Sequence, residues 1–412
     1  MARIIIKNLG PIKEVKLTLN RVNVFMGPQS CGKSTIAKII SFCSWFEKEA
    51  IINGRQTRFY EQLVEYHELD AVYFRDNSYI EYQSDFSHIV FQGTNDEKLK
   101  VDIFVGPENI YKNKKICYIP AERNFVTIPD IERYNNNTSR KGFLDDWTEA
   151  RLSKIPGIYQ FEIPTLNDTH FYYDRSKNAN LLLLKNGVTI QLGHSSSGLK
   201  SVIPMLVVFY RFCRNLHSIV KVPNAYYYMQ KQAVLDRVSP ADKERITTIL
   251  ANPDAFPRNE VEKILGFQHQ YHHAEFIIEE PEQNLFPTTQ QELIYYWLFW
   301  LHMLNYDDSN TFGPDMLTIT THSPYILYAL NNCMLSHLVI DKMPKGENKR
   351  WKSSIDPRMV SIWEIEDGTF KSIEGSENGT IQDEQGLIGQ NYFDESMRFV
   401  MDNFNDMLNY LD

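Results

Sequence analysis

Long apolar runs are missing from this sequence. No stretch of its 412 residues approaches the roughly 18 consecutive apolar residues that a membrane-spanning helix needs. The first residues, MARIIIKNLG, alternate apolar and polar side chains as a strand does, and they lack the apolar core of a signal peptide. We therefore expect a cytoplasmic protein without a membrane partner.

Cysteine is scarce and unpaired, and positive charge is not concentrated. The five cysteines, at positions 31, 43, 117, 213 and 333, have no paired spacing, which argues against a disulfide framework or a zinc site. The net charge is −9, and the segment from residue 374 to the end carries nine acids and one base, so the rest of the chain is close to neutral. Bulk charge therefore predicts no broad nucleic-acid surface, although DNA binding through a local patch stays open.

Apolar periodicity predicts an α/β fold. Strands alternate with helices in the second half of the sequence, at 276–278 (strand), 287–304 (helix), 316–320 (strand) and 324–332 (helix). This order predicts a mostly parallel sheet flanked by helices. Shorter strands within 72–118 and 169–192 predict an additional antiparallel β lobe, and no heptad run is long enough for an extended coiled coil.

The segment GPQSCGKST fits the phosphate-loop pattern G-x-x-x-x-G-K-[ST]. Gly27 and Gly32 let backbone N–H groups wrap around phosphates, and Lys33 brings a cation to the β- and γ-phosphates. The hydroxyl of Ser34, which completes the motif, can bind Mg²⁺, and we expect Thr35, directly after it, to contact the nucleotide as well. An ordinary glycine turn is the alternative, but the segment follows the apolar strand VNVF and opens a helix, as a phosphate loop does. The pattern predicts ATP and Mg²⁺ as cofactors.

Two adjacent carboxylates end the apolar strand FIIEE, just before Pro281. Burying unpaired charge is costly, so either the strand reaches the surface here or the carboxylates have a ligand. A P-loop ATPase needs a second strand whose end presents a carboxylate to Mg²⁺ and a group that orients the attacking water. We expect Glu279 to bind Mg²⁺ and Glu280 to act as the catalytic base.

Two further segments contain polar residues next to a helix start. In GHSSSGLKSVIPM, Ser196, Ser197 and Gly198 precede an apolar helix, as a plain helix cap or as an anion site. In LTITTHSPYIL, His322 follows a strand and could contact the γ-phosphate, although a lone histidine is usually structural. Beside a phosphate loop and FIIEE, we interpret both segments as parts of the nucleotide site.

These four segments, in this order, resemble the ABC-type ATPase heads of the SMC and Rad50 class, and in particular the OLD-like branch of bacterial ATPases. The resemblance covers residues 1 to about 335. It implies that the signature formed by Ser196, Ser197 and Gly198 completes the nucleotide site of a second subunit, giving a homodimer or higher homo-oligomer with composite ATP sites. The segment YIPAERN resembles a loop of that branch that reports on Mg²⁺ and nucleotide, with Glu122 and Arg123 as candidates.

Three features depart from the OLD-like pattern. Glu279 stands where aspartate is more usual, and Lys200 stands where glutamine is expected after the signature. The C-terminal segment shows no D-x-D cluster, so we expect no intrinsic TOPRIM nuclease. We expect the head at 1–335, with insertions at about 125–160 and 217–270, and a C-terminal hairpin with an acidic amphipathic helix at 336–412.

The resemblance also implies a function. Stand-alone heads of this kind occur as ATPase subunits of antiphage systems of the PARIS and Septu type, in which a separate nuclease or toxin is the effector. We therefore expect an ATPase whose nucleotide-driven dimer state regulates a separate effector protein. A DNA-repair or chromosome-handling ATPase that clamps DNA is the alternative, and a transporter's ATPase subunit is a weaker one.

Three segments outside these motifs remain. His269, His272 and His273, within QHQYHHAEF, could suggest a metal site, but no acid or cysteine accompanies them at matching spacing, so we expect a solvated loop. The basic cluster at 341–352 either contacts DNA or a partner, or is the solvated tip of a hairpin. The segment 393–411 has apolar residues at intervals of four, three, four, three and four, which predicts a helix with one apolar stripe. That stripe packs on its own core or on another subunit or partner.

Overall fold

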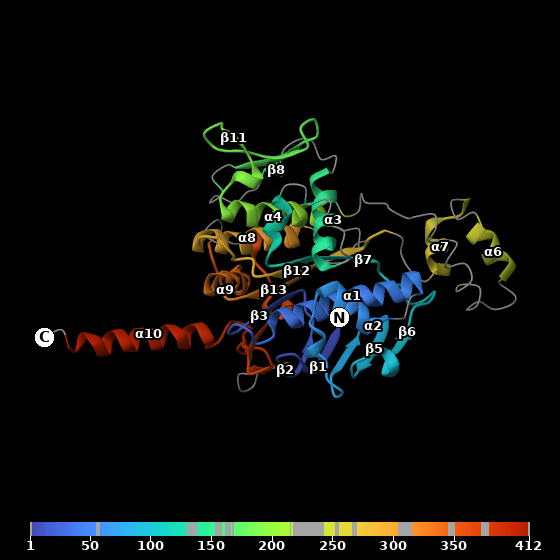
Figure 1. The fold of residues 1–412 in the computed structure, drawn as a ribbon, viewed down its shortest axis with the longest axis horizontal. Coiled ribbons are helices and arrows are strands. Elements are labelled where there is room, and N and C mark those ends of the chain that lie inside the picture. The colour runs from blue at the N-terminus through green and yellow to red at the C-terminus, as the bar shows by residue number, and fades with distance from the viewer. Residues whose placement is uncertain are drawn as a thin grey trace.

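The computed structural model describes residues 2–54, 58–128, 131, 138–152, 159–160, 166, 169–214, 216, 243–251, 255–265, 270–303, 315–344, 351–371 and 379–410. Within these residues, eleven strands form one large sheet and four form a small one. The strand order of the large sheet is β6-β5-β4-β1-β2-β15-β14-β3-β13-β12-β7. Figure 1 shows helices on both faces of this sheet and a single helix, α10, that projects away from it.

The large sheet has a parallel half and an antiparallel half. The parallel half contains β14 (Val360–Glu366), β3 (Val22–Met26), β13 (Met316–Thr321), β12 (His273–Glu279) and β7 (Lys114–Ile119). The antiparallel half contains β2 (Ile12–Thr18), β1 (Arg3–Leu9), β4 (Tyr79–Gln83), β5 (Ser87–Gln92) and β6 (Lys100–Ile103). The predicted α/β class is confirmed, with the antiparallel strands continuing the parallel sheet at its edge.

Helices bury both faces of the parallel half, as a doubly covered sheet requires. Alternate residues of β3 point to opposite faces of the sheet, so Val24 and Met26 join one core while Phe25 joins the other. The first core contains α3 (Ser139–Leu152), α4 (Ser197–Arg214), α8 (Pro287–Met303) and α9 (Pro324–Val339). The second core contains α1 (Lys33–Asn53) and α2 (Phe59–His67). The parallel strands and their connecting loops are therefore held rigidly between two helical layers.

A small antiparallel sheet lies beyond α3 and α4 (Figure 1). It consists of β8 (Tyr159–Gln160), β9 (His170–Asp174), β10 (Ala179–Leu183) and β11 (Thr189–Gln191). Phe171 packs against Trp147 of α3, so this sheet is attached to the first core. A hairpin turn at Asn186 and Gly187 joins β10 to β11, with Gly187 at a φ of 81°.

The C-terminal hairpin belongs to the large sheet. Strand β14 pairs in parallel with β3, the strand that leads into the phosphate loop, and it turns at Asp367 and Gly368 into β15 (Thr369–Lys371). A Cβ on Gly368 would lie 2.3 Å from the Pro11 carbonyl oxygen, so this turn fits only with glycine. The expected boundary at residue 335 therefore does not divide the sheet. Among the described elements, only α10 (Tyr392–Leu408) stands apart.

The two expected insertions are described only in part. Helix α3, within the first one, buries Trp147 and is integral to the core. Of the second one, α6 (Lys243–Ala251) and α7 (Arg258–Leu265) are described, and they pack near the end of α1. Residues 345–350 of the basic cluster lie outside the described residues. None of the described helices combines the length and the apolar character needed to cross a membrane.

Candidate nucleotide site

The loop between β3 and α1 has the backbone of a phosphate loop. Gly27 and Gly32 have φ values of 139° and 110°, which side-chain-bearing residues rarely adopt. A Cβ on Gly27 would lie 2.3 Å from the Ile365 carbonyl oxygen, and a Cβ on Gly32 would lie 2.9 Å from Ile12 Cγ1. The hairpin and β2 thus press on the loop, and glycine lets it turn at both points into the N-terminus of α1.

Lys33, the first residue of α1, points back into this loop. Its ammonium group donates to the carbonyl oxygens of Gly27 at 3.0 Å and Pro28 at 2.6 Å, and burial lowers its pKa. A cavity of about 590 Å³ opens beside it. The cavity is lined by Pro11, Gln29, Ser30, Gly32, Lys33, Ser34, Thr35, Tyr73, Glu280 and His322. The structure therefore brings the phosphate loop together with the predicted base and histidine.

Glu280 lies at the carboxyl end of the parallel strands, held in a fixed position. Its backbone has a φ of 41°, and its N–H donates to the Thr320 carbonyl oxygen at 3.0 Å. One carboxylate oxygen lies 3.5 Å from His322 Nε2, and the other accepts from Gln283 Nε2 at 2.9 Å. The hydrogen bond from His322, helped by Gln283 and by the charge of Lys33, lowers the pKa of Glu280 to about 2 against the effect of burial. The carboxylate is therefore ionised at neutral pH and faces the cavity.

Glu279 has the opposite character. Its side chain is buried, and its Oε1 has no hydrogen-bond partner within the part of the chain that the structure describes. Burial raises its pKa, while Lys38, Tyr118 and Ser34 lower it only in part. A buried carboxylate oxygen without a partner is costly, and a divalent cation would satisfy it. The residues present thus fit Mg²⁺, with Glu279 and Ser34 as the groups that would hold it.

The position of His322 depends on a third carboxylate. The backbone N–H of His322 donates to Glu282 Oε1 at 2.6 Å, and the half-buried position of Glu282 raises its pKa. Glu282 therefore ties the turn after β12 to the turn after β13. The sequence shows Glu282 as a third acid after the strand, but only the fold reveals this contact, because the two residues are 40 positions apart.

Arg123 lies behind the carboxylates and does not line the cavity. Its guanidinium is fully buried and donates to the carbonyl oxygens of Glu279 at 2.9 Å and Glu280 at 3.0 Å. It also donates to Pro281, and its Nε donates to Ser201 of α4 at 3.2 Å. Burial lowers its pKa to about 10, which leaves it charged at neutral pH. Arg123 thus fastens the turn after β12 to α4, while the neighbouring Glu122 is exposed.

The predicted signature residues lie outside the cavity. Ser196 and Ser197 are exposed at the N-terminus of α4, and Ser196 Oγ accepts from the Leu199 N–H at 3.4 Å. Gly198 packs closely on the loop after β12, because a Cβ there would lie 2.8 Å from the Asn284 carbonyl oxygen. None of the three lines the cavity that contains Lys33 and Glu280. Within one chain, the signature and the phosphate loop are therefore separate surfaces.

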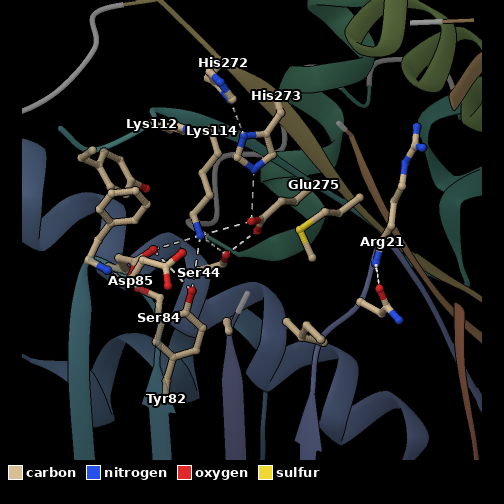
Figure 2. Close-up of a pocket in the computed structure, with 17 residues that line it drawn as sticks. Arg21, Ser44, Tyr82, Ser84, Asp85, Lys112, Lys114, His272, His273 and Glu275 are labelled. Atoms are coloured by element: carbon tan, nitrogen blue, oxygen red, sulfur yellow. Dashed lines mark hydrogen bonds and ion pairs between the residues drawn. The ribbon is translucent and has the colours of Figure 1, made fainter. Parts of the chain in front are cut away.

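A second cavity, of about 300 Å³, lies at the other end of the same strands (Figure 2). Lys114 is buried there between Glu47 at 3.0 Å and Glu275 at 3.2 Å, and it donates to Ser44 Oγ at 2.6 Å. Burial alone would lower the pKa of Lys114, but the two carboxylates raise it well above its usual value. This buried network was not predicted from the sequence.

Two of the three histidines expected in a solvated loop, His272 and His273, belong to this second cavity. His273 Nε2 lies 3.5 Å from a Glu275 oxygen, and the ring of His272 lies against that of His273. His272 is buried, and the side chain of His273 is 15% exposed. The expectation was wrong for these two residues, because His272 directly precedes β12, His273 begins it, and both line the second cavity. His269 lies outside the described residues. The signal available in the sequence was Glu275, two positions after His273.

Comparisons with known proteins found no matching family model and no matching curated protein. Solved structures with similarity include the SMC head domain from Thermotoga maritima, at 8% identity and a TM-score of 0.34, covering 79% of this chain and 90% of that one. A dimeric bacterial ABC transporter cassette has 13% identity and a TM-score of 0.27, covering 89% and 96%. The recombination mediator RecF has 12% identity and a TM-score of 0.28, with the same coverage.

The fold and the cavity define the class of the chain. A phosphate loop joins a parallel strand to a helix, adjacent carboxylates end a second parallel strand two places away in the sheet, and a histidine ends the strand between them. This arrangement is a P-loop α/β fold with a mostly parallel sheet flanked by helices.

Proposed function

We propose that the chain is a Mg²⁺-dependent ATPase whose ATP-bound state joins two copies head to head and thereby regulates a separate effector protein. One observation carries the proposal. Lys33, Glu280 and His322 share one cavity, while Ser196 and Ser197 are exposed on another surface of the same chain. A helix N-terminus with free hydroxyl groups suits a phosphate brought by a second copy.

In this mechanism, the loop from Gly27 to Gly32 binds the phosphates through its backbone N–H groups. Lys33 turns from its own loop carbonyls to the β- and γ-phosphate oxygens. Mg²⁺, when bound by Ser34 and Glu279, supplies positive charge that offsets the charge of the phosphates. The residues of the chain thus hold the triphosphate in place for attack.

Glu280 orients the attacking water. Because Gln283 and His322 fix its two oxygens, the carboxylate faces the cavity in one orientation and stays ionised. His322, held through its backbone by Glu282, contacts the γ-phosphate and detects its loss. Arg123 transmits that change, since it bonds both to the Glu280 carbonyl and to α4, which carries the signature.

The test uses two substitutions in the cavity. Glu280→Gln should bind ATP, hydrolyse it ~10²–10⁴-fold more slowly and accumulate an ATP-bound dimer, because only the proton acceptor is lost. Lys33→Ala should lose ATP binding. Glu366→Gln, the same change at an exposed residue at the end of β14, serves as the matched control. Phosphate release and light scattering measure both effects, and a wild-type rate for Glu280→Gln would refute the assignment of the base.

A separate effector protein is the second component of the proposed function. Helix α10 is exposed and acidic, which suits a protein surface better than the polyanionic backbone of DNA. We expect the product of an adjacent nuclease or toxin gene to co-purify with the ATP-bound protein and to leave on hydrolysis. ATP hydrolysis stimulated by duplex DNA, without such a protein, would favour the DNA-clamping alternative.

A further inference from the structure

Helix α10 projects from the head, and from Met397 onward nothing in the described chain covers it (Figure 1). Its first turn is anchored, because Asn391 is fully buried and forms a capping box with Asp394. The Tyr392 N–H donates to Glu364 at 2.9 Å, and Glu395 pairs with Lys371 at 3.0 Å. The base of the helix is therefore rigid, while no residue of the helix is buried.

The exposed apolar residues of α10 follow a heptad. Met397, Val400, Phe404 and Met407 are separated by three, four and three positions, and their exposed fractions are 62%, 59%, 51% and 64%. We call these four residues the seam. Intervals of three and four place them on one face, in the a and d positions that two paired helices bury between them. Side chains of this size are normally covered when they line one helix face.

The positions that flank the seam indicate the partner. In a pair of helices, the e and g positions face those of the other helix and set partner choice by charge. Here the flanking residues within the helix are uncharged, namely Ser396, Met401, Asn403 and Leu408. The acids Glu395, Asp402 and Asp406 and the one base, Arg398, lie away from the seam, and Asp394 precedes the seam in the capping box. Two identical helices can therefore meet along this seam without bringing like charges together.

The helix is too short to hold two copies together alone. It has 17 residues, fewer than the roughly 20–30 residues that each side contributes to a standard interface. Isolated helices of about 12–15 residues are themselves marginal in water. Two helices tethered to heads that are already joined, however, meet at millimolar effective concentration. The seam therefore fits a contact that forms in support of the head-to-head dimer.

We propose that α10 of one copy pairs along its seam with α10 of a second copy when nucleotide joins the two heads. The proposal rests on the nucleotide-driven dimer of the proposed function and adds the second contact that stabilises it. Because the base of α10 is fixed by Asn391 and Glu364, a change in how the heads meet is carried directly to the helix pair. Opening of the heads then separates the seams as well.

The test compares two phenylalanines of the same helix in a Glu280→Gln background with ATP and Mg²⁺. Phe404 belongs to the seam, and Phe399 is more exposed, at 69%, but lies off it. Phe404→Asp should raise the dimer dissociation constant at least tenfold, and Phe399→Asp should change it less than about twofold. Analytical ultracentrifugation measures the constant with and without ATP. Both variants should keep the melting temperature and the ATP affinity of the parent, since α10 lies outside the core.

The outcomes separate this inference from the proposed function. A parent that dimerises with ATP, together with a Phe404→Asp variant that dimerises equally well, overturns the seam and leaves the proposed function intact. A parent that stays monomeric with ATP overturns both. A dimer that forms without ATP and is lost in Phe404→Asp supports the seam while contradicting nucleotide control. Equal weakening by Phe399→Asp and Phe404→Asp overturns the heptad pairing.

Discussion

Strand β12 carries one buried glutamate at each end, and the two have opposite surroundings. Glu275, near the start of the strand, accepts from Ser44 and pairs with Lys114 at 3.2 Å. Glu279, at its carboxyl end, has a buried oxygen with no partner. Burial would raise the pKa of both, yet Lys114 and its neighbours bring the pKa of Glu275 down to about 2, while that of Glu279 stays raised.

At Glu275, the protein itself supplies the charge partner of the buried carboxylate, whereas at Glu279 a ligand would supply it. Around Glu275, the protein supplies the cation itself, so the network fixes α1 and β7 against β12. Around Glu279, Lys38 offsets the effect of burial only in part, and Mg²⁺, which we propose as a ligand, would offset the remaining cost of the buried charge. The carboxyl end of a parallel sheet is where ligands of open α/β folds bind. We therefore expect the carboxyl end of β12, where we propose that nucleotide binds, to contribute less than the other end to the stability of the nucleotide-free protein.

The largest effect is expected when Lys114, the cation that pairs with Glu275, is removed. Lys114→Met leaves Glu47 and Glu275 buried without their common partner and should lower the free energy of unfolding by ~3–5 kcal/mol. Urea denaturation of the nucleotide-free protein measures this. Lys112→Met, at an exposed lysine two residues earlier, is the matched control and should change it by less than ~0.5 kcal/mol. Equal midpoints for the two variants would contradict a structural role of the network.

A smaller effect, of opposite sign at the two ends, is expected when each glutamate becomes glutamine. At neutral pH, Glu275→Gln should destabilise the nucleotide-free protein by ~1–3 kcal/mol, because a buried charged hydrogen bond is lost. Glu279→Gln should stabilise it by ~0.5–2 kcal/mol, because an uncompensated charge is removed from a ligand site. Glu279→Gln should also abolish any stabilisation by Mg²⁺ and ATP. Destabilisation by both changes would contradict the comparison.

The two effects should also depend on pH in opposite ways. The folded pKa of Glu275 is about 2, below its usual 4.5, so its stabilisation is complete above pH 4.5 and is lost as the pH falls towards 2. The folded pKa of Glu279 is raised, so its ionisation costs stability only above pH 4.5, and the gain from Glu279→Gln shrinks as the pH falls towards that value. Unfolding series at several pH values measure both trends.

The sequence predicts well those parts of the site that are formed by residues adjacent in the chain. The phosphate loop, the Glu279–Glu280 pair and the strand before His322 are local patterns, and the structure brings Lys33, Glu280 and His322 to one cavity as expected. The site residues themselves stay predictions until they are tested by mutation. Local patterns suffice here because the carboxyl ends of neighbouring parallel strands meet at one edge of a sheet.

What the sequence does not predict depends on contacts between distant residues. The Lys114 network joins Glu47, Lys114 and Glu275, which lie on three elements far apart in the chain. None of these three residues belongs to a recognisable sequence motif. The place of β14 beside β3 depends on sheet topology, since residues 360 and 22 pair although a local pattern shows only a hairpin. Arg123 was chosen as a candidate, but its role in holding the Glu279 and Glu280 carbonyls is visible only in the fold.

The central claim, that one copy completes the nucleotide site of another, is tested most directly by mixing two inactive proteins. Lys33→Ala removes the phosphate cation. Ser197→Glu places an acid at the exposed N-terminus of α4, where it suits the helix but repels the γ-phosphate of a second copy. Each variant alone should hydrolyse almost no ATP. The mixture should regain activity well above the sum of the two, because a mixed dimer contains one intact site. Wild-type activity of Ser197→Glu alone, or a mixture no more active than its parts, would contradict the composite site.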